Sequence, residues 1–150
     1  MKPLKESEII ISDDKFLLDL NIIYNFLTIC YWSEGISKEI VRKSIDGSMC
    51  FGVYKENKQI GFGRVITDKA TFAYLADVFI IEGCRGLGYS KQLINFILKH
   101  TDLQNLKRFM LATKDAHRLY NQFGFSELTF TDRWMHIHKP DLYKGNKNVM

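Results

Sequence analysis

The sequence of 150 residues lacks most of the features that place a chain outside the class of ordinary globular proteins. It has no run of about 18 apolar residues, so it predicts no transmembrane helix. Its opening residues have no apolar core like that of a signal peptide. Its three cysteines, Cys30, Cys50 and Cys84, are odd in number, far apart and without metal-ligand spacing. We therefore expect reduced thiols in a cytoplasmic protein, with no metal site.

A strong charge of one sign is also missing, because 21 lysines and arginines stand against 17 aspartates and glutamates, a formal net charge of +4. No block of like charges resembles the arm of a nucleic-acid-binding protein. We therefore expect no nucleic acid or membrane partner, and the small positive excess is compatible with an anionic ligand. Repeats and linkers are absent as well, so we expect a single domain over residues 1–150, with residues 139–150 as a loosely ordered tail.

What is present is a mixed order of strand and helix patterns in a chain that is 46% hydrophobic. The apolar patterns predict strands at 8–12, 50–54, 59–66, 71–81, 108–113, 125–130 and 134–138. Helical spacing of apolar residues predicts helices at 15–30, 38–45, 89–100 and 115–123, the first capped by Asp13 and Asp14. The expected fold class is α/β with mixed α+β character: a mixed central sheet of six to seven strands flanked by about four helices.

The order of these patterns predicts how the strands pair. The strands before residue 83 follow one another through short turns, which favours antiparallel pairing. The strand at 108–113 follows a helix, and the right-handed crossover rule returns it parallel to the strand at 71–81. Two neighbouring parallel strands in such a sheet can splay apart at their C-terminal ends, and we expect a ligand to lie in that gap.

The most informative segment is the turn Arg85-Gly86-Leu87-Gly88, between the apolar strand and the helix at 89–100. Strand, glycine-rich turn and helix in this order aim unpaired backbone N–H groups and the positive end of a helix dipole at one point. Gly86 and Gly88 have no Cβ and tolerate positive φ, so a bulky anion can approach closely. We therefore predict a phosphate-bearing ligand. The chain has no Gly-Lys-Ser/Thr sequence and the turn follows antiparallel strands, which disfavours a nucleotide triphosphatase and a dinucleotide-binding fold.

Two segments resemble signatures of the GNAT superfamily of acyl-CoA-dependent N-acetyltransferases. Arg85-Gly86-Leu87-Gly88-Tyr89-Ser90 is similar to the family's phosphate signature of Arg or Gln, two residues, Gly, one residue, and Gly or Ala, with Ser90 in the last place. The segment Ala116-His-Arg-Leu-Tyr-Asn-Gln-Phe-Gly-Phe125 is similar to the family's helix Ala-x-x-Leu-Tyr-x-x-Phe-Gly-Phe. Thr113 stands where many members place an asparagine, and we include it among the cofactor-binding candidates. The resemblance covers nearly the whole chain, and it implies the GNAT fold.

The resemblance implies an enzyme that moves an acetyl group from acetyl-CoA to the amine of a small molecule, by direct attack within a ternary complex and without a metal. It places the pantetheine arm of CoA along the backbone of Val78, Phe79 and Ile80, with an N–H group near Phe79 directed at the thioester oxygen. It places Tyr120 near the CoA sulfur, where a phenol can protonate the departing thiolate, although packing explains this tyrosine too. The diphosphate of CoA rests on the backbone N–H groups of Arg85, Gly86, Leu87, Gly88, Tyr89 and Ser90.

Two carboxylates are candidates for the general base. Asp77 lies inside the apolar strand, where an acid is costly unless it is paired or functional. Strand alternation puts it on the same face as Leu75 and Phe79. Glu34 lies in a loop that borders the acceptor cleft in GNAT proteins. A structural alternative stays open for each of them. Asp77 can instead pair with a lysine, an arginine or a backbone N–H group, and Glu34 can be a solvated loop residue.

Three aromatic residues, Tyr31, Trp32 and Tyr74, form a candidate acceptor pocket for a cationic or apolar amine, and packing alone explains them about as well. Two other functions stay open. One is acetylation of a protein lysine or N-terminus, and the other is a CoA-binding regulatory module without catalysis. The last strands of this fold often pair between subunits, so the resemblance is also compatible with a homodimer.

Overall fold

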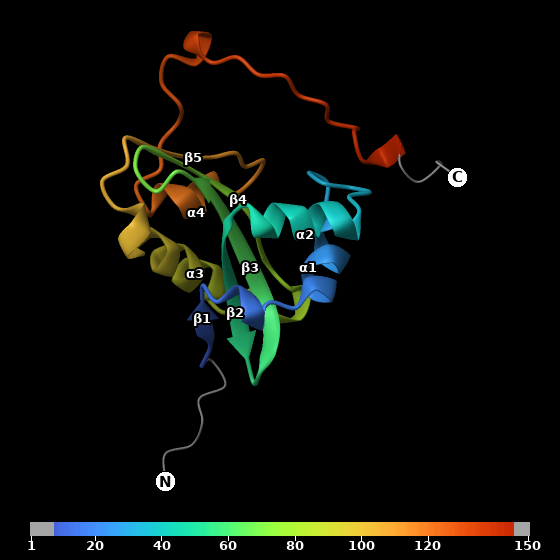
Figure 1. Ribbon diagram of the computed structural model, residues 1–150. Helices are drawn as coiled ribbons and strands as arrows, with labels where there is room; N and C mark the ends of the chain where they lie inside the picture. Colours follow the sequence, from blue (N-terminus) through green and yellow to red (C-terminus); the bar gives the residue numbers. More distant parts are fainter. Residues whose placement is uncertain (1–7, 146–150) are drawn as a thin grey trace.

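The computed structural model describes residues 8–145, in which helices cover both faces of one sheet (Figure 1). Residues 1–7 and 146–150, which include the start of the chain and the end of the expected tail, lie outside the described residues. The sheet has the strand order β1-β2-β3-β4-β5, antiparallel from β1 to β4 and parallel between β4 and β5, as predicted. The strands are β1 (Ile10–Ser12), β2 (Met49–Lys55), β3 (Lys58–Thr67), β4 (Phe72–Ile80) and β5 (Arg108–Leu111).

Two of the α-helices begin where a side chain accepts hydrogen bonds from their first N–H groups. α1 begins where the Asp19 carboxylate accepts hydrogen bonds from the N–H groups of Asn21 and Ile22. α2 begins where the Ser37 hydroxyl accepts one from Ile40. None of the helices in residues 8–145 is both long and apolar enough to span a membrane. The helices of this part of the chain are α1 (Leu20–Leu27), α2 (Lys38–Asp46), α3 (Tyr89–Leu98) and α4 (His117–Asn121).

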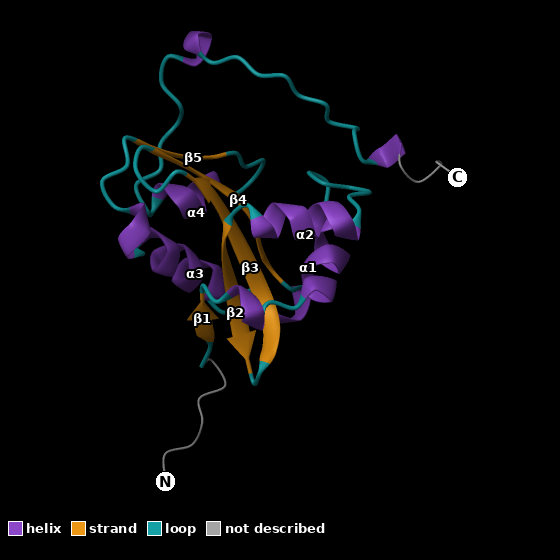
Figure 2. Ribbon diagram, in the orientation of Figure 1, coloured by secondary structure: helices purple, strands orange, loops and turns teal. Residues whose placement is uncertain are grey.

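The sheet separates two hydrophobic cores. α3 and α4 cover one face of the sheet, and α1 and α2 cover the other (Figure 2). Leu93 and Ile97 of α3 are fully buried in the first core, and Ile23 and Leu27 of α1 are buried in the second. These residues lie four apart in each helix, so each helix presents one apolar stripe to the sheet. Each fully buried side chain of this size contributes about 1.5–3 kcal/mol, which holds the helices in place.

β4 contains a bulge that shifts its side chains from one face to the other. Between two successive register pairs β3 advances by two residues and β4 by three. The extra residue is accommodated at Asp77, whose φ of +57° is unusual for a residue other than glycine. Leu75 therefore packs in the core under α3, whereas Phe79 packs in the core under α1. The prediction that both residues share one face was wrong, because it assumed an unbroken strand.

The described residues form five strands rather than the expected six to seven. The predicted strands at 125–130 and 134–138 are absent, and residues 129–142 instead form an extended arm that crosses from the side of α4 to the side of α1 and α2 (Figure 1). Every residue of this arm is exposed. Its alternating apolar pattern is that of a half-buried strand, but a strand also needs a neighbour to bond with, and the arm pairs with no strand of the described sheet, although the ring of Trp134 lies 4.6 Å from the guanidinium of Arg108 in β5.

The predicted helix at 15–30 is divided in the structure. The Asp14 carboxylate accepts a hydrogen bond from the N–H group of Phe16 and caps a short 3-10 turn, Lys15–Leu17, rather than the helix itself. The chain is then extended at Leu18 before α1 begins. The ring of Phe16, which helical spacing placed on the buried face, is 99% exposed.

Candidate active site

β4 and β5 pair over a short stretch and then separate. Their register runs from Phe72 opposite Arg108 to Leu75 opposite Leu111, where β5 ends. β4 continues to Ile80, so among residues 8–145 its outer edge beyond Leu75 has no neighbouring strand. A cavity of about 960 Å³ opens at this point. This is the gap between splayed parallel strands that the sequence predicted.

The cavity brings together eight of the sixteen residues that the sequence singled out. Arg85 lines it, and the glycine turn and α3 follow directly along the chain. Glu34, the backbone candidates Phe79 and Ile80, and residues 86–90 are not among the described residues that line it. The predicted site residues in its wall are Tyr31, Trp32, Tyr74, Asp77, Val78, Arg85, Thr113 and Tyr120.

The turn before α3 has the geometry of an anion-binding helix start. Gly86 and Gly88 have φ values of +81° and +83°, and Gly88 is the N-cap of α3. The start of a helix leaves the N–H groups of its first turn without an intrahelical acceptor. A Cβ built on either glycine meets no protein atom within 4 Å, so the space above the turn is open. A phosphate-sized anion therefore fits at this helix end.

Arg85 and Thr113 are held by contacts with the backbone beside the cavity. The Nε of Arg85 donates a hydrogen bond to the carbonyl oxygen of Ile80 at 2.9 Å. The Oγ1 of Thr113 accepts one from the N–H group of Ala116 at 3.0 Å. Arg85 thus ties the end of β4 to the glycine turn, and Thr113 ties the end of β5 to the start of α4.

Tyr120 reaches the cavity from α4. Its side chain is 9% exposed, and its ring packs edge-on against Phe125 with the ring centroids 5.8 Å apart. Burial raises the pKa of its phenol above the ordinary value. The phenol therefore stays protonated at neutral pH, which is the state that a proton donor needs.

The bulge determines which backbone groups of β4 face the cavity. The N–H group of Ile81 donates to a carbonyl oxygen of β3 at 2.8 Å. Alternation along the strand then directs the backbone groups of Phe79 toward β3, and those of Val78 and Ile80 toward the open edge. The carbonyl of Ile80 indeed accepts its hydrogen bond from Arg85 rather than from β3. This geometry favours Val78 over Phe79 as the backbone donor that faces a ligand in the gap.

Asp77 is the partner of two side chains in the cavity wall. Its Oδ2 accepts a hydrogen bond from the Nε of Arg64 at 2.9 Å, and its Oδ1 accepts one from the Nε1 of Trp32 at 2.9 Å. The side chains of Arg64 and Asp77 are 16% and 11% exposed, so most of this ion pair is shielded from water. The structure therefore gives Asp77 the ion pair that the sequence left as an alternative to a base.

One part of the cavity wall is aromatic. Tyr31, Trp32 and Tyr74 all line it, and the rings of Tyr31 and Trp32 meet edge to face with centroids 5.2 Å apart. The Nζ of Lys114 lies 5.3 Å from the centroid of the Tyr31 ring. Glu34 instead forms an ion pair with Lys144, whose Nζ lies 3.3 Å from the Oε2 of Glu34.

A family model for the acetyltransferase (GNAT) family matches residues 20–125, from the start of α1 to just beyond α4. The chain belongs to the GNAT acetyltransferase family. The match spans the glycine turn, the separated strands and Tyr120. Membership makes this GNAT protein an acyltransferase.

Known proteins similar to this GNAT chain include solved structures. A GNAT protein of Xanthomonas campestris pv. campestris, provisionally assigned as an acetyltransferase, is 44% identical with a TM-score of 0.89, over 91% of this chain and 96% of that one. A curated protein of Gibberella zeae, named provisionally as an acetyltransferase, is 27% identical in an alignment 136 positions long that covers 75% of this chain and 76% of that protein. A GNAT acetyltransferase of Elizabethkingia anophelis with acetyl-CoA bound shares the fold, with a TM-score of 0.63 at 17% identity over 87% of this chain and 88% of that one.

Other residues in the wall of the GNAT cavity were not among the sequence candidates. Arg64 carried a signal, because a cation in the apolar strand β3 beside an acid in β4 predicts an ion pair. No sequence signal pointed to His138 or Tyr143, because the spacing of apolar and polar residues does not reveal that the chain passes over the cavity. The residues missed include Arg64, Lys114, Asp115, His138 and Tyr143.

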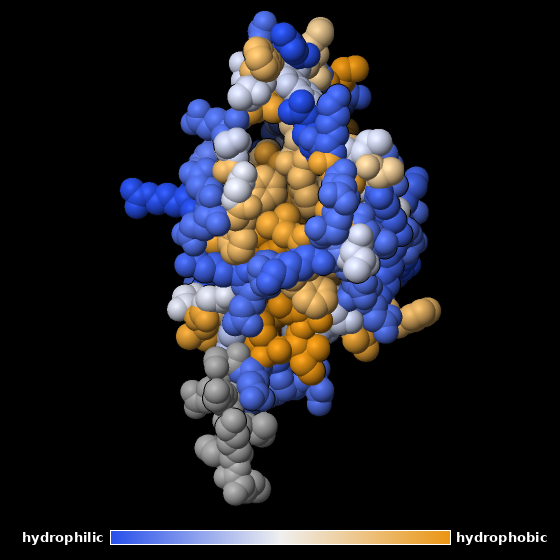
Figure 3. Space-filling model, turned by 90° about the vertical axis from the view of Figure 1, so that its left-hand side faces the viewer, coloured by the Kyte–Doolittle hydropathy of each residue, from blue (hydrophilic) through white to orange (hydrophobic). Residues whose placement is uncertain are grey.

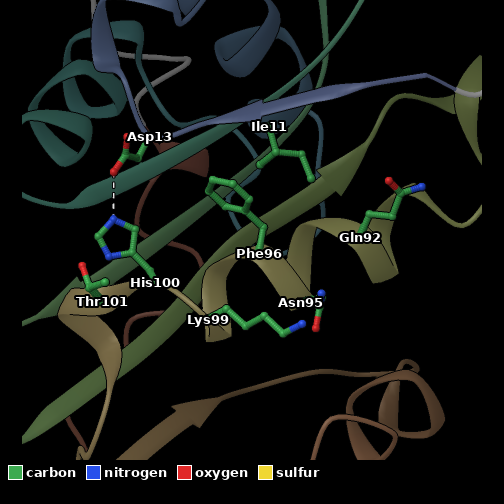
Figure 4. Close-up of a pocket in the computed structure, with 8 residues that line it drawn as sticks. All are labelled: Ile11, Asp13, Gln92, Asn95, Phe96, Lys99, His100 and Thr101. Carbon is green, nitrogen blue, oxygen red and sulfur yellow. Dashed lines mark hydrogen bonds and ion pairs between the residues drawn. The ribbon is translucent and has the colours of Figure 1, made fainter.

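A second cavity of the GNAT domain, of about 580 Å³, lies between β1 and the C-terminal half of α3 (Figure 4). The Nε2 of His100 lies 2.8 Å from the Oδ2 of Asp13, and its Nδ1 accepts a hydrogen bond from the N–H group of Asp102 at 3.1 Å. Both ring nitrogens are engaged with the protein, so this pair ties the chain after β1 to the end of α3 and offers no free base. Within residues 8–145 no group of three or more His, Cys, Asp or Glu side chains is placed to hold a metal ion.

Proposed function

We propose that the protein transfers the acetyl group of acetyl-CoA to the amine of a small molecule. The observation that carries this proposal is the unpaired edge of β4 beyond Leu75, which opens into the cavity lined by Tyr120. A strand edge without a neighbour offers N–H and C=O groups to an extended ligand, and the pantetheine arm of CoA is an extended chain with two amide groups. The acetyl-CoA bound to the Elizabethkingia anophelis relative supports this assignment.

The diphosphate of CoA binds at the start of α3 in this proposal. The left-handed conformations of Gly86 and Gly88 orient the N–H groups of the turn, and no side chain stands above them. The positive end of the α3 dipole adds an attraction for the negative charge. The candidate contacts are the backbone N–H groups between Arg85 and Ser90, and Thr113 lies beside the gap.

The transfer forms one bond and breaks one. The lone pair of the neutral amine attacks the thioester carbonyl carbon, and the N–H group of Val78 stabilises the oxyanion, an effect worth roughly 3 kcal/mol for a preorganised donor. The C–S bond then breaks, and the phenol of Tyr120 gives its proton to the departing thiolate. The acceptor ammonium, with a pKa near 10, loses its first proton to water in the cavity. The tyrosinate regains a proton from the acylated nitrogen through water.

The chain beyond α4 supports a small acceptor rather than a protein. His138 in the arm and Tyr143 just after it line the cavity, so this segment passes over the site. A cavity crossed in this way admits a small molecule more readily than the lysine or N-terminus of a protein. Its volume also lies in the range of about 300–1,000 Å³ that is typical of small-molecule sites. The three free thiols support the cytoplasm as the location of the enzyme.

We also propose a homodimer in which the arm contacts a second copy. Phe130, Met135 and Ile137 of the arm are 63%, 94% and 94% exposed. The outer edge of β5 has no neighbour among the described strands, and the half-buried rings of Phe109 and Phe125 lie in the same core region. Hydrophobic side chains gather on the side of the molecule that carries α3 (Figure 3). The chain thus has both an unpaired extended segment and an unpaired strand edge, and two copies related by a twofold axis can cover each other.

Light scattering during size-exclusion chromatography tests the dimer. We expect the mass of two chains for the wild type, and the mass of one chain for the double variant Met135→Glu with Ile137→Glu. The matched control is Phe16→Glu, which changes an equally exposed apolar residue outside the arm and should remain dimeric. A monomeric wild type at micromolar concentration contradicts the dimer and leaves the proposed reaction unaffected.

Calorimetry and a thiol-release assay test the reaction. The wild type should bind acetyl-CoA and release CoA thiol with at least one class in a panel of polyamines, aminoglycosides, amino acids, arylalkylamines and peptides. Gly88→Ala should bind acetyl-CoA at least about tenfold more weakly, because alanine is strained at this φ and its methyl group occupies the anion's space. The control Gly83→Ala lies in the same loop without positive φ and should bind normally. Binding without thiol release favours a non-catalytic module, and absence of binding refutes the proposal.

A further inference from the structure

We propose that Asp77 is a positioning residue that joins the bulge of β4 to the acceptor wall through Trp32, and that it is not the general base. The inference rests on the proposed acetyl transfer, because it assigns a role within that site. It concerns three residues on separate elements: Asp77 in β4, Arg64 in β3, and Trp32 in the loop between α1 and α2.

The backbone of Asp77 is in a conformation that needs support. It is the one non-glycine residue within the described strands whose φ, +57°, lies in the left-handed region. This conformation costs free energy for residues with a Cβ, and it persists where the surrounding structure holds it. An aspartate tolerates it better than most residues do, because its short side chain can be held by local hydrogen bonds. Both carboxylate oxygens of Asp77 are held here.

One carboxylate oxygen anchors the bulge to the neighbouring strand and to α2. The Oδ2 of Asp77 accepts from the Nε of Arg64 at 2.9 Å, and a terminal nitrogen of Arg64 donates to the Oγ of Ser48 at 3.0 Å. The hydroxyl of Ser48 in turn donates to the carbonyl oxygen of Ser44 in α2 at 2.7 Å. This chain of hydrogen bonds fixes the position of Arg64, and through it the position of the carboxylate.

The other oxygen anchors the acceptor wall. The Nε1 of Trp32 donates to the Oδ1 of Asp77 at 2.9 Å. The indole ring has Tyr31 on one side at 5.2 Å and Phe26 of α1 at 6.2 Å between centroids. Phe26 also stacks on Phe79, the second residue after the bulge, at 3.9 Å. The orientation of Trp32 is therefore set by the strand that carries the thioester site.

This arrangement opposes a role as base and supports a role in positioning. Each oxygen of Asp77 already accepts one hydrogen bond from the protein, one of them from a cation, and the side chain is 11% exposed, so only one lone pair on each oxygen remains and little of the carboxylate is open to a substrate. The bulge, in contrast, directs the backbone N–H group of Val78 to the open edge of β4. Losing the carboxylate should therefore misplace the oxyanion donor and the acceptor wall together, while the diphosphate site at α3 stays intact.

Trp32→Phe gives the sharpest test, because it keeps an aromatic ring and removes the N–H donor. We expect kcat/KM for the acceptor to fall at least about tenfold and acetyl-CoA affinity to stay unchanged, because displacements near 1 Å have effects of this size. The control Asp102→Asn removes a charge from an exposed side chain that does not line the cavity, and it should keep the wild-type value. A base would gain from the freed oxygen, so an unchanged or higher rate overturns the proposal.

Asp77→Asn separates the two roles by pH. Asparagine keeps an oxygen for Trp32 and tolerates the left-handed backbone, so we expect partial activity and an acid limb of the pH–kcat profile at the wild-type position. Loss of a true base typically lowers kcat about 10²–10⁴-fold and removes the acid limb of the profile. Such a result for Asp77→Asn overturns the proposal.

Fluorescence tests the link without any turnover. The chain has two tryptophans, so Trp134→Phe leaves Trp32 as the reporter. In that background Asp77→Gly, which suits the positive φ, should shift the Trp32 emission, and the control Asp102→Asn, outside the cavity, should leave it unchanged. If the emission of Trp32 does not shift in Asp77→Gly, the link between Asp77 and Trp32 is overturned. If the emission shifts but the protein binds no acetyl-CoA, the link holds and it is the proposed reaction that has failed.

Discussion

A Cβ on Gly35 would lie 2.6 Å from the carbonyl oxygen of Tyr143, so the chain that returns from the arm passes directly over this glycine. Gly35 has a φ of +87°, and beside it Lys144 forms its ion pair with Glu34. Tyr143 lines the cavity at this point. The missing side chain of Gly35 thus sets where the C-terminal segment meets the acceptor side of the site.

Alanine at Gly35 should displace Tyr143 from the cavity wall. We expect KM for the acceptor to rise at least about fivefold while acetyl-CoA affinity stays the same, because only the acceptor wall moves. The left-handed backbone adds a destabilisation of about 1–2 kcal/mol. Gly124→Ala has a similar φ of +93° and open space around its Cβ, so it measures that strain alone. If urea unfolding shows the same decrease in the free energy of unfolding for Gly35→Ala and Gly124→Ala, the contact between residue 35 and Tyr143 does not contribute to the effect.

The sequence predicted the parts of the site that depend on local backbone chemistry. Gly86 and Gly88 were predictable because a glycine-rich turn between a strand and a helix is typical of an anion-binding helix start, and both have positive φ. The parallel return of β5 and the open end of β4 followed from the crossover rule. The role of a side chain such as Tyr120 came from the resemblance to GNAT proteins, and burial on α4 agrees with it without testing it.

The parts that were missed depend on contacts between distant residues. The bulge at Asp77 is invisible in a strand whose pattern is almost continuously apolar, so alternation gave the wrong face for Leu75 relative to Phe79. The arm has the pattern of a strand, yet strand formation depends on a partner that local residues do not specify. Glu34 was a candidate base because its loop borders the acceptor cleft in GNAT proteins, and nothing near it in the sequence points to its ion pair with Lys144.

Tyr120→Phe should lower turnover at least about tenfold while acetyl-CoA affinity stays nearly intact, because the variant loses the proton donor and keeps the ring. Calorimetry and thiol release at pH 8 separate the two effects. Burial raises the pKa of the Tyr120 phenol above its ordinary value of 10.0, so the phenol is protonated at pH 8. The loss of activity caused by ionisation of Tyr120 should therefore appear only above pH 10. An unchanged turnover would remove Tyr120 from the mechanism.

Cys50 should make the folded state less stable at alkaline pH. Its side chain is 1% exposed, and burial raises the pKa of the thiol from 9.0 to about 11. The unfolded chain therefore loses this proton first, and the stabilisation, fully present below pH 9, is lost as pH rises toward 11. Between pH 9 and 10 the free energy of unfolding should fall by about 1 kcal/mol from this group. Urea titrations of Cys50→Ala should lack that part of the slope, and Cys84→Ala should keep it.

Tyr54→Phe should make the protein more stable. The hydroxyl of Tyr54 is buried without a hydrogen-bond partner among the described residues, and the side chain folds over Gly52, where a Cβ would overlap it. Burial also raises the pKa of this phenol to about 12, because ionisation inside the protein is costlier still. An unpaired buried hydroxyl costs about 1–3 kcal/mol, so its removal should raise the free energy of unfolding by about 1 kcal/mol in urea at pH 7. Tyr74→Phe, which removes a hydroxyl from the cavity wall, should give no such gain. A loss of stability in Tyr54→Phe would mean that the hydroxyl has a favourable partner, and the packing of Tyr54 on Gly52 would then need another explanation.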